Sequence, residues 1–249
     1  MDNVLNEVYE EWFFRDNIAD SLPMAKYLAP KIKEYLNITS VFDVGCAAGH
    51  WMSCFEKEGC EISGLEGTTN ATPYMMVDID KIDIHDLREP YEKIQNVDLV
   101  YSIEVVEHVE PDYADNFVDA LTRHGASYIL LTAAPPGQGG HGHYNLQYKS
   151  YWINKFKSKG YEVFPEFKNK IIDWCKEARE TSNAPIEYRR VAVEGDGTGL
   201  NAGEVRIAAN WETHEDAMEG NFDKLSFKKW DNIWIPFWFP QNMITLRKK

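Results

Sequence analysis

A β-branched run that leads into a glycine turn and then a helix is the feature that most constrains the fold of this chain. Residues 38–44 form a run rich in β-branched and aromatic residues, Gly45 and Gly49 follow it, and a helix is expected over residues 49–57. A buried strand that passes into a helix in this way begins a βαβ unit, in which helices connect parallel strands. The sequence therefore predicts an α/β fold.

Short apolar runs alternate with amphipathic helices along most of the chain. Further strands are predicted at residues 60–65, 74–79, 97–103, 127–132, 161–164 and 242–246. Helices are predicted at residues 21–35, 113–123, 147–159 and 169–180, and two less regular strands at residues 186–193 and 204–209. Together these elements predict a Rossmann-like sheet of seven mostly parallel strands with helices on both faces, an N-terminal helical segment and a C-terminal insertion.

Charge and cysteine content exclude several classes of protein. The formal net charge of -14 disfavours binding to nucleic acid or to an anionic membrane surface. No run approaches the roughly 20 apolar residues that cross a bilayer, and the N-terminal residues do not resemble a signal sequence, so we expect a cytoplasmic protein without membrane contact. The four cysteines show no Cys-x-x-Cys spacing and predict neither a zinc site nor a disulfide framework.

The glycine turn indicates a nucleotide-type cofactor. Glycines at a strand-to-helix turn let the backbone approach a ligand, and the N-terminus of the helix offers free N–H groups to an anion. A dinucleotide fingerprint needs Gly-x-Gly-x-x-Gly, whereas this chain has Ala47 and His50 where the second and third glycines would stand. A cofactor that lacks the pyrophosphate group therefore fits the turn better.

The Asp-x-Gly-x-Ala-x-Gly sequence that begins at Asp43 resembles the first motif of class I S-adenosylmethionine (SAM)-dependent methyltransferases. The resemblance implies that Asp43, Gly45 and Gly49 lie against the methionine end of SAM. It implies the same cofactor site for the neighbouring Cys46, Ala47 and Trp51.

Three later positions extend the resemblance in the same order as in that family. Glu66, followed by Gly67, matches the acid that accepts hydrogen bonds from both ribose hydroxyls. Asp86, followed by Leu87, matches the residue that accepts from the adenine amino group. Residues 97–108 end in a Glu-x-x-Glu-His signature typical of one group of these enzymes, which implies further cofactor contacts from Ile103, Glu104 and His108.

A Gly- and Pro-rich loop at residues 132–145 resembles a loop of bacterial and phage methyltransferases associated with sugar modification, and residues 238–242 resemble their closing strand. The resemblance implies methyl transfer to a hydroxyl of a small molecule or glycan. Because such a hydroxyl must lose its proton, we expect His143 to act as the base, with His141 second and with Asn145 and Gln138 orienting the acceptor. Alternatively, His143 only shapes the loop by hydrogen bonding to its backbone.

Other interpretations of these residues stay open. His141 and His143 could bind a divalent ion, but no carboxylate cluster is near them in the sequence, so we expect no metal. The acceptor could instead be tRNA or protein, or the chain could bind SAM without catalysis.

The chain is expected to form one domain. Residues 1–37 provide N-terminal helices, 38–164 the cofactor-binding core, 165–230 an insertion that contacts substrate or a second subunit, and 231–249 the closing strand. Either a monomer or a homodimer agrees with this division.

Overall fold

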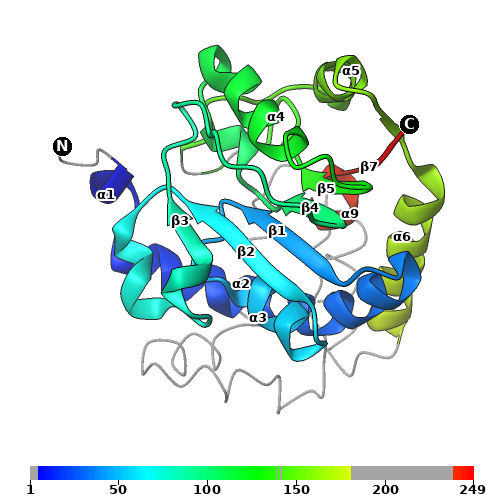
Figure 1. Cartoon of the computed structure of the whole chain (residues 1–249), viewed down its shortest axis with the longest axis horizontal. Coiled ribbons are helices and arrows are strands. Elements are labelled where there is room, and N and C mark those ends of the chain that lie inside the picture. The colour runs from blue at the N-terminus through cyan, green and yellow to red at the C-terminus, as the bar shows by residue number, and fades with distance from the viewer. Residues whose placement is uncertain (1–4, 139, 141, 181–237) are drawn as a thin grey trace.

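The computed structural model describes residues 5–138, 140, 142–180 and 238–249, and its centre is a seven-stranded sheet (Figure 1). The order of the strands is β3-β2-β1-β4-β5-β7-β6. Strand β7 runs antiparallel to β5 and β6, and the other neighbouring pairs are parallel. The predicted α/β fold with seven mostly parallel strands is confirmed. The strands are β1 (Ser40–Val44), β2 (Glu61–Glu66), β3 (Ile82–Ile84), β4 (Leu99–Ser102), β5 (Tyr128–Thr132), β6 (Tyr161–Val163) and β7 (Met243–Lys248).

Helices cover both faces of the sheet (Figure 1). Helices α2 (Glu11–Leu36), α3 (His50–Lys57) and α6 (Pro165–Glu180) pack on one face together with the short α9 (Trp238–Asn242). Helices α4 (Ala114–Thr122) and α5 (Lys149–Ser158) pack on the other.

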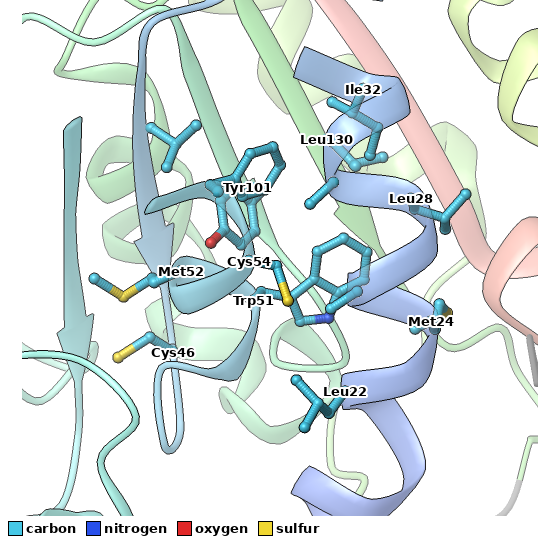
Figure 2. Packing of buried hydrophobic residues seen from close by; sticks show 14 of the residues in the cluster. Leu22, Met24, Leu28, Ile32, Cys46, Trp51, Met52, Cys54, Tyr101 and Leu130 are labelled. Carbon is cyan, nitrogen blue, oxygen red and sulfur yellow. The ribbon is translucent and has the colours of Figure 1, made fainter. Parts of the chain in front are cut away.

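Alternation along the strands divides the core into two clusters. In β4, Tyr101 belongs to the cluster under α2 and α3, whereas Val100 belongs to the cluster under α4 and α5. Figure 2 shows the first cluster, in which Leu22 and Leu28 of α2 lie near Trp51 of α3. Both faces of the central strands are therefore buried, as in other parallel sheets.

The side on which the chain adds successive strands to the sheet changes between β1 and β4. The chain adds β2 and β3 on one side of β1 and then returns to add β4 and β5 on the other. The loops that follow β1 and β4 consequently leave the sheet in opposite directions, and ligands of open α/β sheets bind at such a point, beyond the carboxyl ends of the strands.

The prediction of a strand at residues 74–79 is wrong. Residues Thr69–Tyr74 form the 3-10 helix η1, Ile79–Lys81 form η2, and the third strand is the later β3. Between the two 3-10 helices, the Met76 N–H donates to the Ala48 carbonyl at 2.9 Å, so this apolar segment packs on the glycine turn instead of joining the sheet.

Residues 238–242, expected to resemble a closing strand, form the helix α9, and the closing strand is β7. The other predicted elements within the described residues occur with shifted ends, and the largest shift is in the N-terminal helix, which begins at Glu11. A short helix, α1 (Leu5–Val8), precedes it. The two strands predicted at residues 186–193 and 204–209 lie outside the described residues. Within the described ranges, no helix combines the length and apolar character needed to span a membrane.

Candidate functional site

The turn after β1 requires glycine at two positions. Gly45 and Gly49 have φ values of 81° and 70°, in the left-handed region. A Cβ on Gly45 would lie 2.6 Å from the Val105 side chain, and one on Gly49 would lie 2.8 Å from Val77. Ala47, between them, also has a positive φ of 48°. The turn is therefore packed closely between the loop after β4 and the segment that follows β2.

Glu66 lies beside this turn at the carboxyl end of β2, and its residue is 8% exposed. One carboxylate oxygen accepts a 2.8 Å hydrogen bond from the Ala47 N–H, and the other accepts a 3.1 Å bond from the Thr68 N–H. Burial raises the pKa of Glu66 to about 7, against the opposing effect of these backbone donors. Each oxygen keeps a lone pair for a further donor, as a ribose-binding acid requires.

The N-terminal residues fold over the loop after β2. The Asn70 amide donates to the carbonyls of Asn6 and Tyr9 at 2.8 and 2.9 Å, and the Thr68 hydroxyl donates to the Asn6 side chain. A Cβ on Gly67 would lie 2.8 Å from the Leu5 side chain. Gly67, predicted to contact the cofactor, thus allows α1 to approach, a contact that the sequence alone did not indicate.

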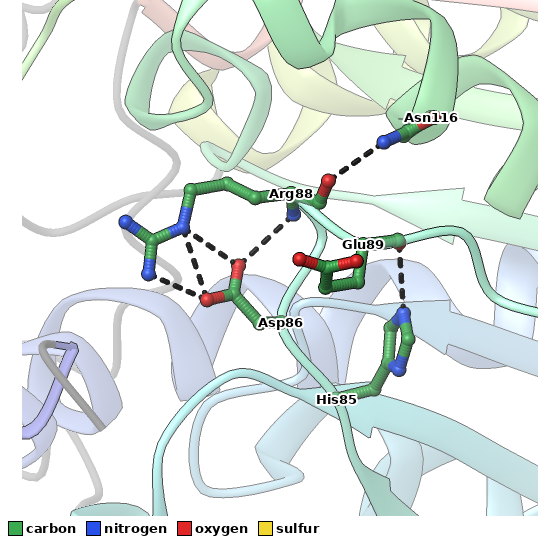
Figure 3. Close-up of polar contacts among 5 residues, drawn as sticks. All are labelled: His85, Asp86, Arg88, Glu89 and Asn116. Carbon is green, nitrogen blue, oxygen red and sulfur yellow. Dashed lines mark hydrogen bonds and ion pairs between the residues drawn. The ribbon is translucent and has the colours of Figure 1, made fainter. Parts of the chain in front are cut away.

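Asp86 follows β3 and is held by Arg88 (Figure 3). The Arg88 Nε lies 3.0 Å from both carboxylate oxygens, and its backbone N–H donates to one of them at 2.9 Å. Burial raises the pKa of Asp86, but the hydrogen bonds and charge of Arg88 outweigh this effect and hold it below its usual range. The Arg88 carbonyl in turn accepts from Asn116 at 2.7 Å, and the neighbouring Leu87 packs on the core under α4 and α5. Asp86 is thus an ionised, oriented acceptor.

The side chains of Asp43, Cys46 and Trp51 lie in the core. Burial raises the pKa of Asp43 well above its usual value, although the Tyr101 hydroxyl beside it opposes this. The Trp51 indole N–H donates to the Ser21 hydroxyl at 3.0 Å, and its ring lies in the cluster of Figure 2. The Trp51 side chain therefore contacts α2, and its predicted contact with the cofactor stays a prediction.

The loop after β4 carries the Glu-x-x-Glu-His signature. Glu104 has a positive φ of 54°, and its N–H donates to the Thr132 hydroxyl at 2.7 Å, while Ile103 packs against the core. Glu107, in the 3-10 helix η3 (Val106–His108), is fully buried. Burial first, and the nearby Glu104 carboxylate second, raise the pKa of Glu107 well above its usual value.

Glu107, His108 and His143 come together at this edge of the sheet. Each offers a ligand atom, and these atoms lie within 4.8 Å of one another. The rings of His108 and His143 are edge-to-face with centroids 5.0 Å apart. The Glu107 carbonyl accepts from the N–H groups of Tyr144 and Asn145 at 2.8 and 3.0 Å, so the loops after β4 and β5 are joined beside the cluster.

The loop after β5 places His143 against backbone. Burial lowers the pKa of His143, and a hydrogen bond to the Gln138 backbone opposes this shift, so the neutral imidazole is favoured. A Cβ on Gly140 would overlap the imidazole, with the ring Nδ1 only 2.6 Å away. His141 lies outside the described residues.

Asn145 and Gln138, predicted to orient the acceptor, hold this loop in place. The Asn145 amide donates to the Val109 carbonyl at 2.9 Å, and the Gln138 side chain accepts from Asn242 at 3.0 Å. No carboxylate cluster is near His143 in the sequence, but the fold brings the Glu107 carboxylate close to it in space. The signal for this proximity was the pairing of β4 with β5, because the loops that follow neighbouring parallel strands leave the same edge of the sheet.

No protein-family model and no curated protein matches the chain. Among solved structures, the methyltransferase domain of a bacterial CtHen1 is 15% identical with a TM-score of 0.47, covering 59% of this chain and 88% of its own. The sugar N-methyltransferase KedS8 from Streptoalloteichus sp ATCC 53650 is 11% identical with a TM-score of 0.47, covering 59% and 81%. Magnesium protoporphyrin IX methyltransferase from Synechocystis PCC 6803, solved with bound SAM, is 14% identical with a TM-score of 0.44, covering 56% and 70%. Likenesses this weak concern the fold alone.

Proposed function

We propose that this chain is a SAM-dependent methyltransferase whose acceptor is a hydroxyl of a small molecule or glycan. The observation that carries the proposal is the Glu66 carboxylate, buried at the end of β2 and hydrogen-bonded to the Ala47 N–H of the glycine turn. A carboxylate in this place can accept from two vicinal hydroxyls of a nucleoside while the turn accommodates the rest of the molecule.

The residues of the site fit SAM. Gly45 and Gly49 let the backbone turn where a side chain would clash, and each Glu66 oxygen accepts one backbone hydrogen bond and keeps a lone pair. Asp86, oriented by three N–H donors of Arg88, can accept from the adenine amino group with the one lone-pair site that they leave. We retain Gly45, Ala47, Gly49, Glu66 and Asp86 as the proposed cofactor contacts, together with the backbone at Ile103 and Glu104.

When bound, SAM supplies a methyl group on a positively charged sulfur. The chain must hold the acceptor oxygen in line with that methyl group and exclude water, because positioning provides most of the rate enhancement in such a displacement. Glu107, His108 and His143 lie on the two loops that leave the sheet at this edge. They are the groups proposed to take up the proton that the acceptor hydroxyl loses. His141 stays the second proposed base, and residues 165–230 stay a proposed insertion that contacts substrate or a second subunit.

The cofactor part of the proposal is tested by calorimetric titration with SAM and with its product, S-adenosylhomocysteine. The wild type should bind both. Glu66→Ala should weaken binding about 10- to 100-fold, since a hydrogen bond to a charged group contributes about 1.5–3 kcal/mol. Glu61→Ala is the matched control, because Glu61 is an exposed glutamate at the other end of β2. Absence of binding in the wild type, or equal affinities for all three proteins, would contradict the proposal.

The acceptor class needs a separate test. Transfer of labelled methyl from SAM should be measured against sugars, small hydroxyl compounds, tRNA and peptides. Product with a sugar or small hydroxyl compound is expected. Product only with tRNA or peptide would replace the proposed acceptor class, and SAM binding without product from any class would favour a non-catalytic SAM-binding protein.

A further inference from the structure

We propose that Lys149 and Lys168 form a binding site for a phosphate group, and that the methyl acceptor is a small hydroxyl compound that carries this phosphate. The proposal rests on the proposed function and deepens it, because it names a chemical group of the acceptor. Lys149 begins α5 and Lys168 lies in the first turn of α6, two helices that cover opposite faces of the sheet (Figure 1).

The two lysines meet where α9 passes into β7. The Lys149 ammonium donates to the Gln241 carbonyl, and the Lys168 ammonium donates to the Met243 carbonyl at 3.1 Å. The Lys168 side chain also lies beside the Lys149 ammonium. Two part-buried cations are thus held together by two backbone carbonyls that are two residues apart.

The lysine pair lies at the edge of the sheet that carries the proposed site. Met243 pairs with Thr132, at the carboxyl end of β5. The Asn242 side chain, between the two carbonyls, donates to the Gln138 side chain at 3.0 Å, and Gln138 belongs to the loop that carries His143. The lysine pair is therefore joined to the loop that the proposed function assigns to the acceptor.

The positive charges of the pair are not balanced by the described residues. No carboxylate forms an ion pair with Lys149 or Lys168 in the part of the chain that the structure describes, whereas Lys155, later in α5, pairs with Asp115 at 2.6 Å. Burial first, and the neighbouring Lys168 charge second, lower the pKa of Lys149 to about 8. Because Lys149 stays mostly protonated at neutral pH, two like charges are kept side by side, and a bound anion removes their repulsion.

Helix capping accounts for only one of the two lysines. The last carbonyls of a helix attract a cation, which explains the bond from Lys149 to Gln241 at the end of α9. It does not explain a second ammonium beside the first, because the two repel each other. Each lysine also lies in the first turn of its own helix, where a cation is disfavoured. The pair is therefore better explained by a ligand than by stability alone.

The donors of the pair fit a phosphate group. Each ammonium has three N–H donors and gives one to a carbonyl, so two remain on each lysine. Four donors and two positive charges match the three oxygens and the roughly 1.5–2 negative charges of a phosphate monoester better than the single charge of a carboxylate. Since the net charge of the chain is -14, an anion is held only where positive charge is concentrated in this way.

The phosphate would anchor the acceptor without reacting. Binding energy at a group remote from the reacting oxygen fixes the orientation of the hydroxyl, which is what an in-line displacement requires. Lys168 belongs to residues 165–230, the segment that the sequence predicts to contact substrate or a second subunit. The pair therefore acts on the specificity for the acceptor and not on the binding of SAM.

Inorganic phosphate tests the site independently of turnover. The full chain is titrated with it in a calorimeter at constant ionic strength. We expect one phosphate per chain and at least about a 10-fold loss of affinity in Lys149→Gln and in Lys168→Gln, since a hydrogen bond between charged groups contributes that much. Lys57→Gln is the control, because it removes the same charge at an exposed position at the C-terminal end of α3 and should bind phosphate as the wild type does.

A second titration identifies the source of the phosphate. Glucose 6-phosphate should displace inorganic phosphate from the wild type, whereas glucose should not. Displacement by an RNA oligonucleotide but not by glucose 6-phosphate would overturn the small-molecule source in favour of a nucleic acid.

Two results would overturn the site itself: no saturable binding of phosphate, or binding that both lysine substitutions leave unchanged. Circular dichroism checks folding; if one variant does not fold the other decides, and if neither folds the comparison of glucose 6-phosphate with glucose on the wild type decides. SAM titration of the same samples separates this proposal from the proposed function. Phosphate binding without SAM binding contradicts the methyltransferase proposal only, whereas SAM binding without phosphate binding contradicts the lysine site only.

Discussion

The Ala47 N–H donates a 2.8 Å hydrogen bond to the carboxylate of Glu66, which joins the glycine turn after β1 to the end of β2. The donor belongs to a residue in the left-handed region, and the acceptor is a buried carboxylate. One bond thus couples an unfavourable backbone conformation to an unfavourable burial of charge. Both costs are measurable as effects on stability.

Glu66 should make stability depend on pH. Burial raises its pKa from 4.5 to about 7, so between these values the folded chain keeps a proton that the unfolded chain has lost. The contribution of Glu66 to stability is therefore greatest below pH 4.5 and falls as pH rises toward 7. Glu66→Gln lacks this loss, so its free energy of unfolding relative to the wild type should rise by up to about 3 kcal/mol between pH 5 and 8. Urea denaturation measures it, and a difference that stays constant across this range would contradict the raised pKa.

Ala47→Gly should stabilise the protein. Ala47 has a φ of 48°, and the left-handed region costs a residue with a Cβ about 1–2 kcal/mol. Because glycine also gains freedom in the unfolded chain, the net increase in the free energy of unfolding should be up to about 1 kcal/mol. The matched control is Ala48→Gly, at a buried neighbour without positive φ, which should lose stability. Equal destabilisation of both variants would show that the turn is unstrained at Ala47.

Gly140→Ala should displace His143. The new Cβ would overlap the imidazole, so the loop or the ring must move. We expect the rate of methyl transfer to fall at least about 10-fold, since a positioned base contributes about 10²–10⁴-fold, while SAM affinity and thermal stability change little. Gly137→Ala is the control in the same loop: Gly137 has a φ of 91°, but a Cβ there meets nothing within 4 Å. Similar rates of methyl transfer in both variants would indicate that loop strain, not contact with His143, decides the outcome.

Trp51→Phe should affect stability and not the cofactor. The substitution removes the hydrogen bond from the indole to Ser21. The buried Ser21 hydroxyl then loses this partner, which should lower the free energy of unfolding by about 1–3 kcal/mol. A double-mutant cycle with Ser21→Ala should show a coupling energy of about 1 kcal/mol. A large loss of SAM affinity in Trp51→Phe, with stability retained, would return the indole to the cofactor site.

Most of the sheet could be predicted from the sequence because its central strands are short runs rich in apolar, β-branched and aromatic residues. The third strand could not: Ile82, Asp83 and Ile84 are only three residues with a charge in the middle, and the more apolar segment before them packs on Gly49 instead. The period of a short apolar run does not reveal which surface it covers.

The candidate site was predictable at the positions fixed by a strand end. Glu66 and Gly45 follow directly from β2 and β1, so their place at the edge of the sheet is a local property of the sequence. The proximity of Glu107 to His143 depends on hydrogen bonds between two loops, and the pairing of Asp86 with Arg88 depends on side-chain rotamers. Neither leaves a periodic or spacing signal in the sequence.

The position of β7 between β5 and β6 affects the order in which the chain can assemble during synthesis. Strand β6, at residues 161–163, hydrogen-bonds to β7, at residues 243–248, and ends the strand order. While the ribosome is still making the residues in between, the nascent sheet ends at β5 with an unpaired edge, which is a site for association with other chains. Completion of β7 covers that edge and seats β6 in the same event.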